Sequence, residues 1–314
     1  MRWLSWVLLV SVLATGGLAA ALWWGQERLI FQPVALPADH RFSLPPDVHE
    51  VDIEVPGARL HALHLRVPDP KGVVFYLHGN AGNLSTWFVN PEFWRSMNVD
   101  LFMVDYRGYG KSTGRIASEA QLLDDVHAAW RSIAPAYVGR RAVFLGRSLG
   151  TGLASQLAAG LEPTQRPDLL VLVSPYQSLD ALAAEHYPWA PTSLLRYRLR
   201  SDEALARIAS SCLSLGQSAT TGETRRDMAV LLLHGERDTL IPPHHSHALA
   251  EHLPGGMLGA VSGLRADDVH ALHDLADRLP GGALITIAGA GHNDLQEFPA
   301  YLNALRQAIG AVMR

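Results

Sequence analysis

The sequence is poor in cysteine and in charge. Its 314 residues include one cysteine, Cys212, so no disulfide can form within the chain. Charged residues make up 18%, the net charge is −4, and no run of basic side chains occurs. Binding to nucleic acid needs such a run or patch, so we expect no nucleic-acid partner. Hydrophobic residues make up 48%, which excludes a disordered chain and suffices for a large buried core.

The amino-terminal region contains a long stretch without charge. No charged residue lies from Trp3 to Trp24. At about 1.5 Å of rise per residue, a helix over this stretch would extend roughly 30 Å, the thickness of the hydrocarbon core of a bilayer. Trp3 and Trp6 lie at one end of the stretch and Trp23 and Trp24 at the other, and aromatic side chains at both ends are typical of the two membrane interfaces. The stretch therefore predicts a membrane-spanning helix.

A cleaved signal peptide is the alternative for this stretch. Arg2 precedes it, and the small residues at 18–21 offer a cleavage site. The apolar part of a signal peptide usually covers only about 7–15 residues, so we favour an uncleaved single-pass anchor over residues 1–26. Arg2 stands in front of the anchor, whereas Glu27 and Arg28 cancel behind it. This asymmetry predicts a cytoplasmic amino terminus, with the large domain that follows on the non-cytoplasmic side.

The rest of the chain predicts one α/β domain. Residues 27–48 are proline-rich and indicate a connector, and the domain follows over 49–314, with a cap-like insertion at about 176–228. Two antiparallel strands are expected first, at about 49–55 and 59–67. Apolar runs then alternate with helical stretches; the runs are 73–77, 99–104, 142–145, 169–173, 229–233 and 284–288, and the helices 118–133, 149–159, 244–253, 267–279 and 299–312. This alternation predicts a mostly parallel sheet with helices on both faces.

The pentapeptide Gly146-Arg147-Ser148-Leu149-Gly150 stands between a predicted strand and a predicted helix. A strand that turns sharply into a helix places the turn residue in a strained conformation, and flanking glycines remove side chains that would collide there. Ser148 is then held above the sheet, and the amide of Leu149 can face a developing oxyanion. The pentapeptide predicts a nucleophilic serine.

Two further residues complete a candidate catalytic triad. A serine needs a base to accept its proton and a carboxylate to orient that base. Asp238 follows the run 229–233, and His292 follows the last run, so both should lie at the same sheet edge as Ser148. Glu236 is the rival acid. The order Ser148, Asp238, His292 is the order expected for a nucleophile held at such a turn.

The segment His78-Gly79-Asn80 after the first parallel strand predicts the second half of an oxyanion hole. We assign one donor to the amide of Asn80 and the other to the amide of Leu149, with Ala81 as a competitor for Asn80. His78 precedes this turn and is interpreted as a brace for the loop. The three histidines at 244, 245 and 247 lack a neighbouring carboxylate pattern, so we expect no metal site there.

These motifs together resemble the α/β-hydrolase family. They are HGNAGN at 78–83, DYRGYGKS at 105–112, GRSLG at 146–150, HGERD at 234–238 and GAGHND at 289–294. More narrowly, the set resembles the membrane-anchored BEM46-like serine hydrolases, also written as the ABHD13-type or YfhR-type group. The resemblance implies Ser148 as nucleophile, Asp238 as acid, His292 as base, Asn80 and Leu149 as oxyanion donors, and no cofactor.

Two stretches, about 213–228 and 255–282, depart from the family pattern by their extra length. Neither removes a triad residue. The predicted function is hydrolysis of carboxylic esters with a small-molecule acyl substrate, apolar or lipid-like, because the cap carries the apolar residues Tyr187, Trp189, Leu194, Leu195 and Tyr197. The alternative for these residues is that they only pack the cap onto the sheet. The alternatives are a serine peptidase or thioesterase with the same triad, or a membrane-tethered binding protein without activity.

Overall fold

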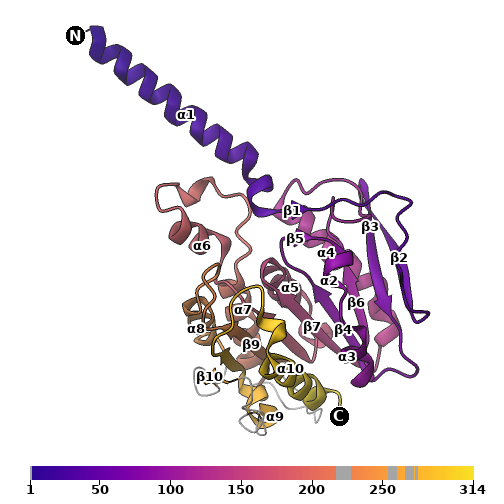
Figure 1. The fold of residues 1–314 in the computed structure, drawn as a ribbon. Coiled ribbons are helices and arrows are strands. Elements are labelled where there is room, and N and C mark those ends of the chain that lie inside the picture. The colour runs from indigo at the N-terminus through magenta and orange to yellow at the C-terminus, as the bar shows by residue number, and fades with distance from the viewer. Residues whose placement is uncertain (1, 217–227, 254–259, 266–271, 273–274) are drawn as a thin grey trace.

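The computed structural model describes residues 2–216, 228–253, 260–265, 272 and 275–314 (Figure 1). Its centre is a sheet of nine strands in the order β10-β11-β9-β8-β7-β4-β6-β3-β2. Strand β3 pairs antiparallel with β2 and with β6, and the other pairs are parallel. The strands are β2 (Val48–Val55), β3 (Ala58–Leu65), β4 (Gly72–Leu77), β6 (Asp100–Val104), β7 (Arg141–Arg147), β8 (Leu169–Val173), β9 (Ala229–Gly235), β10 (Ala260–Leu264) and β11 (Ala283–Ile287).

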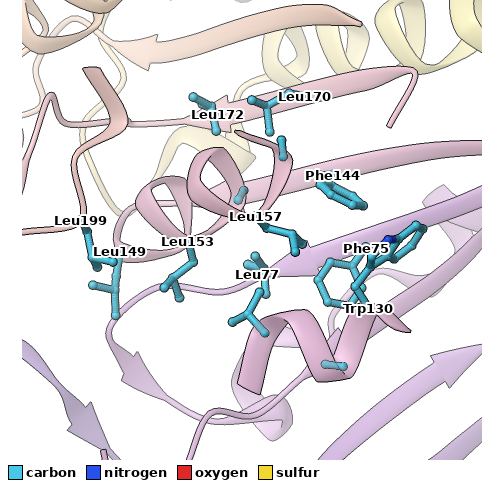
Figure 2. Packing of buried hydrophobic residues seen from close by; sticks show 14 of the residues in the cluster. Phe75, Leu77, Trp130, Phe144, Leu149, Leu153, Leu157, Leu170, Leu172 and Leu199 are labelled. Carbon is cyan, nitrogen blue, oxygen red and sulfur yellow. The ribbon is translucent and has the colours of Figure 1, made fainter. Parts of the chain in front are cut away.

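Helices cover both faces of this sheet, because successive side chains of its buried strands point to opposite sides. Phe75 and Phe144 pack with Trp130 in the core beneath one set of helices (Figure 2), and Val74 belongs to the core on the other face. The first face carries α4 (Glu119–Ile133), α5 (Leu149–Gly160), α7 (Ser201–Gly216) and α8 (His244–Ala250); the second carries α3 (Pro91–Ser96), α9 (Leu275–Arg278) and α10 (Pro299–Val312). The mostly parallel, doubly covered sheet is thus as predicted.

Each predicted strand forms within one or two residues of its expected ends. Strand β10 was not predicted; it pairs with β11 and adds an edge strand inside the extra stretch 255–282. Only the end of the predicted helix 267–279 is described, as α9, since 266–271 and 273–274 lie outside the described residues. The other extra stretch begins in α7, and its residues 217–227 also lie outside.

Helix α1 (Arg2–Ile30) extends away from the domain and continues four residues beyond the predicted anchor (Figure 1). Its most apolar window has a mean hydropathy of 1.9 and is 0% buried, so α1 is not a core helix. By length and composition it suffices to cross a membrane, although a signal sequence has the same properties.

The carboxyl end of α1 docks on the cap, which contains α6 (Leu179–His186). Gln26 is buried; its side chain accepts a hydrogen bond from the Arg196 amide at 2.7 Å and donates to the Leu194 carbonyl at 3.3 Å. Tyr197, expected to line an acyl pocket, is instead fully buried with its ring 5.0 Å from that of Phe31. The prediction that Tyr197 lines an acyl pocket is therefore wrong, because Tyr197 belongs to the junction between α1 and the cap.

Residues directly after α1 are also built into the domain. Strand β1 (Gln32–Pro33) pairs with β5 (Ala81–Gly82) in a separate two-stranded sheet. Residues 31–36 are therefore not a free connector. The remaining short elements are α2 (Leu84–Trp87) and the 3₁₀ turns η1 (Ala134–Tyr137), η2 (Pro163–Gln165), η3 (Thr192–Leu194), η6 (Leu279–Gly281) and η7 (Leu295–Glu297).

Candidate active site

Ser148 occupies a strained turn between β7 and α5. Its backbone has φ 52° and ψ −120°, a conformation that residues with a side chain rarely adopt. A Cβ on Gly146 would lie 2.3 Å from the Gly150 carbonyl oxygen, and one on Gly150 would lie 2.0 Å from that of Leu77. Both glycines are required because strand and helix approach each other too closely for any side chain.

The structure brings the three predicted triad residues together. The Nε2 atom of His292 lies 3.0 Å from the Ser148 Oγ, and its Nδ1 atom lies 2.7 Å from Oδ2 of Asp238. Since the carboxylate only accepts, Nδ1 donates to Asp238, which leaves Nε2 to accept the proton of the serine hydroxyl. The side chain of Asp238 is fully buried, whereas that of His292 is 10% exposed. The imidazole of His292 is therefore partly accessible from outside, whereas the carboxylate of Asp238 is not.

Asp238 is held as a carboxylate by a hydrogen-bond network. Oδ1 accepts from the amides of Leu240 and Ile241 at 3.0 and 2.8 Å, and Oδ2 lies 3.3 Å from Nε2 of His234. Burial raises the pKa of Asp238, but the hydrogen bonds from His234 and His292 outweigh it and hold the pKa well below its usual range. The acid is thus ionised at any pH at which the domain is expected to function.

His234 was not singled out by the sequence analysis. It is fully buried at the end of β9, and its ring contacts the Ser246 hydroxyl and the Ile241 carbonyl. Its position four residues before Asp238, in the motif HGERD, was the available signal. Glu236, the rival acid, accepts a hydrogen bond from the Thr286 hydroxyl at 2.9 Å, so its carboxylate is engaged away from His292.

The loop that carries Asn80 passes beside the serine. A Cβ on Gly79 would lie 3.6 Å from that of Ser148. Within the described part of the chain, no hydrogen bond occupies the amide of Asn80 or that of Leu149. Ala81, the competing donor, lies in β5 opposite Gln32. Two unoccupied amides near the hydroxyl are what stabilisation of an oxyanion requires.

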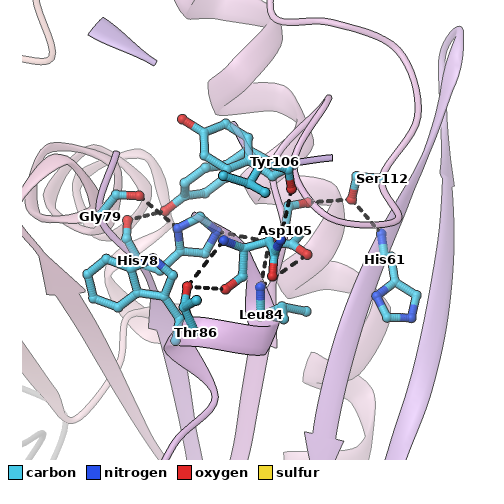
Figure 3. Close-up of polar contacts among 12 residues, drawn as sticks. His61, His78, Gly79, Leu84, Thr86, Asp105, Tyr106 and Ser112 are labelled. Carbon is cyan, nitrogen blue, oxygen red and sulfur yellow. Dashed lines mark hydrogen bonds and ion pairs between the residues drawn. The ribbon is translucent and has the colours of Figure 1, made fainter. Parts of the chain in front are cut away.

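A set of buried polar contacts around His78 supports the loop that carries Asn80 (Figure 3). His78 is fully buried; its Nδ1 atom donates to the Gly79 carbonyl at 2.7 Å, and its Nε2 atom lies 3.4 Å from Asp105. Asp105 accepts from the Leu84 amide, and the Tyr106 hydroxyl donates to the His78 carbonyl at 2.8 Å. These contacts agree with the interpretation of His78 as a brace.

The chain emerging from α1 holds the loop from its outer side. The Gln32 amide donates to the Asn80 carbonyl at 2.8 Å, and the Asn80 side chain donates to the Ile30 carbonyl at 3.3 Å. The Tyr109 hydroxyl also donates to the Asn80 carbonyl, at 2.7 Å. The sequence analysis missed this support, because residues 30–32 precede Asn80 by about fifty positions and carry no motif.

Arg147 is a second residue whose position the sequence did not reveal. Its guanidinium donates to the His292 carbonyl at 3.1 Å and lies 5.5 Å from the ring of Trp87. The arginine beside the serine thus ties the histidine loop to the turn that carries Ser148.

One cluster outside the triad contains potential metal ligands. Glu185, from the cap, supplies the carboxylate that the sequence around His244 and His245 lacked, and the three ligand atoms lie within 4.8 Å of one another. The Gln177 amide donates to Nδ1 of His245, so the ring proton sits on Nε2, which points at Glu185 over 3.3 Å. A protonated Nε2 suits a contact between cap and domain better than coordination of a metal.

Comparison with known proteins places this geometry in a family. A family model described as "Serine aminopeptidase, S33" matches residues 68–199. A protein of Mycobacterium tuberculosis, described only as uncharacterised, is 34% identical over 211 residues, covering 65% of this chain and 72% of the relative. The chain belongs to the α/β-hydrolase family.

Other members support a narrower relationship. Protein bem46 of Schizosaccharomyces pombe is 25% identical over 75% of this α/β-hydrolase and 76% of its own length. Protein YfhR of Salmonella typhimurium is 30% identical over 62% of this chain and 65% of its own length. The resemblance to the BEM46-like and YfhR-type group, inferred from motifs, is confirmed.

Solved structures confirm the α/β-hydrolase fold. An esterase of Pyrococcus furiosus superposes with a TM-score of 0.57 at 16% identity, covering 90% of this chain and 97% of its own. A soluble variant of monoglyceride lipase from Saccharomyces cerevisiae gives 0.56 at 15% identity, with coverages of 87% and 97%. The family model is that of a hydrolase, and the chain is accordingly an α/β-hydrolase enzyme.

Proposed function

We propose that this α/β-hydrolase cleaves carboxylic esters through an acyl-enzyme formed on Ser148. The observation that supports the proposal most directly is the continuous chain of contacts from Ser148 Oγ through His292 to Asp238, at 3.0 and 2.7 Å. Such a chain has no purpose in binding alone, since it raises the nucleophilicity of one hydroxyl.

The reaction then follows from the positions of the groups. Ser148 Oγ attacks the ester carbonyl while its proton passes to Nε2 of His292, and Asp238 stabilises the resulting imidazolium. The amides of Leu149 and Asn80 donate to the oxyanion of the tetrahedral intermediate. His292 returns the proton to the leaving alcohol, and the acyl group stays on Ser148. Water, deprotonated by the same histidine, attacks the acyl carbonyl; the bond to Ser148 Oγ then breaks, His292 returns the proton to Oγ, and the carboxylic acid is released.

We further propose a membrane-anchored enzyme acting on apolar acyl or lipid-like substrates. Trp24 at the end of α1 is 76% exposed, and Tyr187 and Trp189 on the cap are 56% and 61% exposed. Because the cap contacts the end of α1, these aromatic side chains lie where an interface would meet the domain, which is the level that Tyr and Trp favour. The arrangement suits substrates that partition into a membrane.

Covalent labelling tests the catalytic assignment. A fluorophosphonate probe is expected to label the wild type and Ser155→Ala but not Ser148→Ala. Ser155 is a matched control, because it lies on the same helix with its hydroxyl bonded to the Thr151 carbonyl, away from the triad. Labelling of a folded Ser148→Ala protein, or no labelling of the folded wild type, would contradict the proposal.

A panel of substrates separates the remaining alternatives. Esters, thioesters and aminoacyl amides of matched acyl length should be compared by kcat/KM, and we expect the esters to be preferred. A preference for aminoacyl amides would instead favour the peptidase activity that the description of the family model suggests. Alkaline carbonate extraction tests the anchor: the full chain should stay in the pellet, and a protein beginning near Arg28 should be released.

A further inference from the structure

A cavity lies apart from the triad, at the carboxyl end of α1. It encloses about 640 Å³, and its lining includes Trp24, Arg28 and Phe31 from the end of α1 and the chain just after it. Arg107, Arg115 and Arg196 line it from the domain and the cap. None of its lining residues belongs to the triad or to the loop 78–83, so it is a separate site.

Two of these arginines carry charge that nothing in the described structure neutralises. Arg107 is paired with the buried Asp125, and Arg196 is paired with Glu27. Arg28 and Arg115 are exposed, and neither forms an ion pair or a side-chain hydrogen bond with any residue that the structure describes. The cavity therefore presents two unpaired guanidinium groups beside the exposed side chain of Trp24.

The position of the cavity indicates what these groups would bind. Trp24 lies at the end of the uncharged stretch of α1, and Arg28 follows one helical turn later. One turn is about 5.4 Å, a step from the edge of the hydrocarbon core into the headgroup layer. Guanidinium groups bind phosphate oxygens in pairs of parallel hydrogen bonds, and the exposed ring of Trp24 suits an adjoining acyl chain.

We infer that this cavity binds the phosphate headgroup of an anionic phospholipid, with Arg28 and Arg115 as the ligands of the phosphate. The inference goes beyond the proposed hydrolysis, because the bound lipid is held and not cleaved there. It does rest on the proposed membrane anchor for the source of the lipid. Free phosphate offers the same oxygen atoms, so the experiment must separate the two sources.

Native mass spectrometry of the full chain in a neutral detergent measures this binding directly. Phosphatidylglycerol and phosphatidylcholine of identical acyl chains are titrated separately, and inorganic phosphate is titrated alone. The wild type should bind phosphatidylglycerol at least ten-fold more tightly than phosphatidylcholine. The double variant Arg28→Gln/Arg115→Gln should lose about thirty-fold in affinity for phosphatidylglycerol, which corresponds to roughly 2 kcal/mol at about 1 kcal/mol per basic side chain.

Arg131→Gln provides the matched control. Arg131 is an exposed arginine on α4 that lines a different cavity, together with Arg141 at the start of β7, so its loss should leave lipid affinity unchanged. All variants should keep the wild-type melting temperature and probe labelling, which separates failure of this site from failure of the proposed hydrolase. Equal affinity for the two lipids, a preference that survives in the double variant, or tight binding of phosphate without lipid would each overturn the inference.

Discussion

The contact between the chain after α1 and the Asn80 loop leads to a prediction about two truncated proteins. The first begins at Trp24 and keeps every contact of residues 30–34 with the loop. The second begins at Leu36 and loses the hydrogen bonds of Gln32 and Ile30 to Asn80. Both lack the apolar stretch, so a difference between them reports on residues 24–35 and not on membrane insertion.

The structure sets the size of the expected effect. The second truncation removes Phe31, which is 4% exposed, and the two bonds to Asn80 together with those that Val34 makes to Gly82 and Asn83. Burial of a Phe side chain contributes about 2–3 kcal/mol and each of the four hydrogen bonds about 1 kcal/mol net, so we expect a loss of about 6–7 kcal/mol. For a domain of this size that corresponds to a fall of roughly 12–28 °C in melting temperature.

The catalytic effect should appear in kcat. Asn80 would lose the contacts that fix its amide, and a misplaced oxyanion donor costs on the order of a hundredfold or more in kcat. A soluble ester such as p-nitrophenyl acetate, thermal melting and fluorophosphonate labelling give the three measurements. The protein that begins at Trp24 should match the full chain in all of them. Equal kcat and equal melting temperature for the two truncated proteins would refute the reasoning and reduce residues 24–35 to a linker.

Three further predictions concern single residues. Gly150→Ala places a Cβ 2.0 Å from the Leu77 carbonyl oxygen and should lower kcat at least about a hundredfold; Gly310→Ala, with open space around it, should leave kcat unchanged, and a tolerated Gly150→Ala would contradict the turn geometry. Asp238→Asn should lower kcat by about 10⁴ with the fold intact by circular dichroism, because the amide no longer orients the base; a tenfold loss or less would argue against Asp238 as the acid. Burial lowers the pKa of His64 to about 4, so the native state stays neutral while the unfolded chain binds a proton near pH 6.5. The contribution of neutral His64 to the free energy of unfolding is therefore complete above about pH 6.5 and is lost as the pH falls toward 4. Urea unfolding at about pH 4.5 should show that acid lowers the free energy of unfolding by roughly 2 kcal/mol less in His64→Gln than in the wild type. The same loss in both proteins would refute this prediction.

The sheet and the serine turn could be predicted because their signals are local. A strand such as β8 is buried on both faces, so each of its residues is apolar and the run stands out in the sequence. Gly146 is likewise dictated by the Gly150 carbonyl four residues later, whereas Gly150 faces the distant Leu77 carbonyl and was recognised from the motif alone. Strand β10 lacked such a signal, since it is short, lies at the edge of the sheet and contains a glycine and a serine.

The supporting residues of the site could not be predicted, because their contacts join distant segments. His234 gains its role from Asp238 only after β9 and its following turn fold back on the ring. Arg147 reaches the His292 carbonyl, and Ile30 reaches Asn80, across long separations in sequence. The order of the strands in the sheet decides which loops meet at one edge, and no periodicity or spacing in the sequence encodes that order.

The sequence by itself determined the alternation of buried strands and helices, the strained serine turn and the choice of Ser148, Asp238 and His292 as candidates, because each depends on neighbouring residues or on a familiar motif. Only the tertiary structure decided that Asp238 and not Glu236 faces His292, that Glu185 joins the two cap-facing histidines, and that the chain leaving α1 supports the Asn80 loop. The physical reason is that these contacts are made between side chains and backbone groups whose distance is set by sheet register and helix packing, which no single stretch of the chain contains.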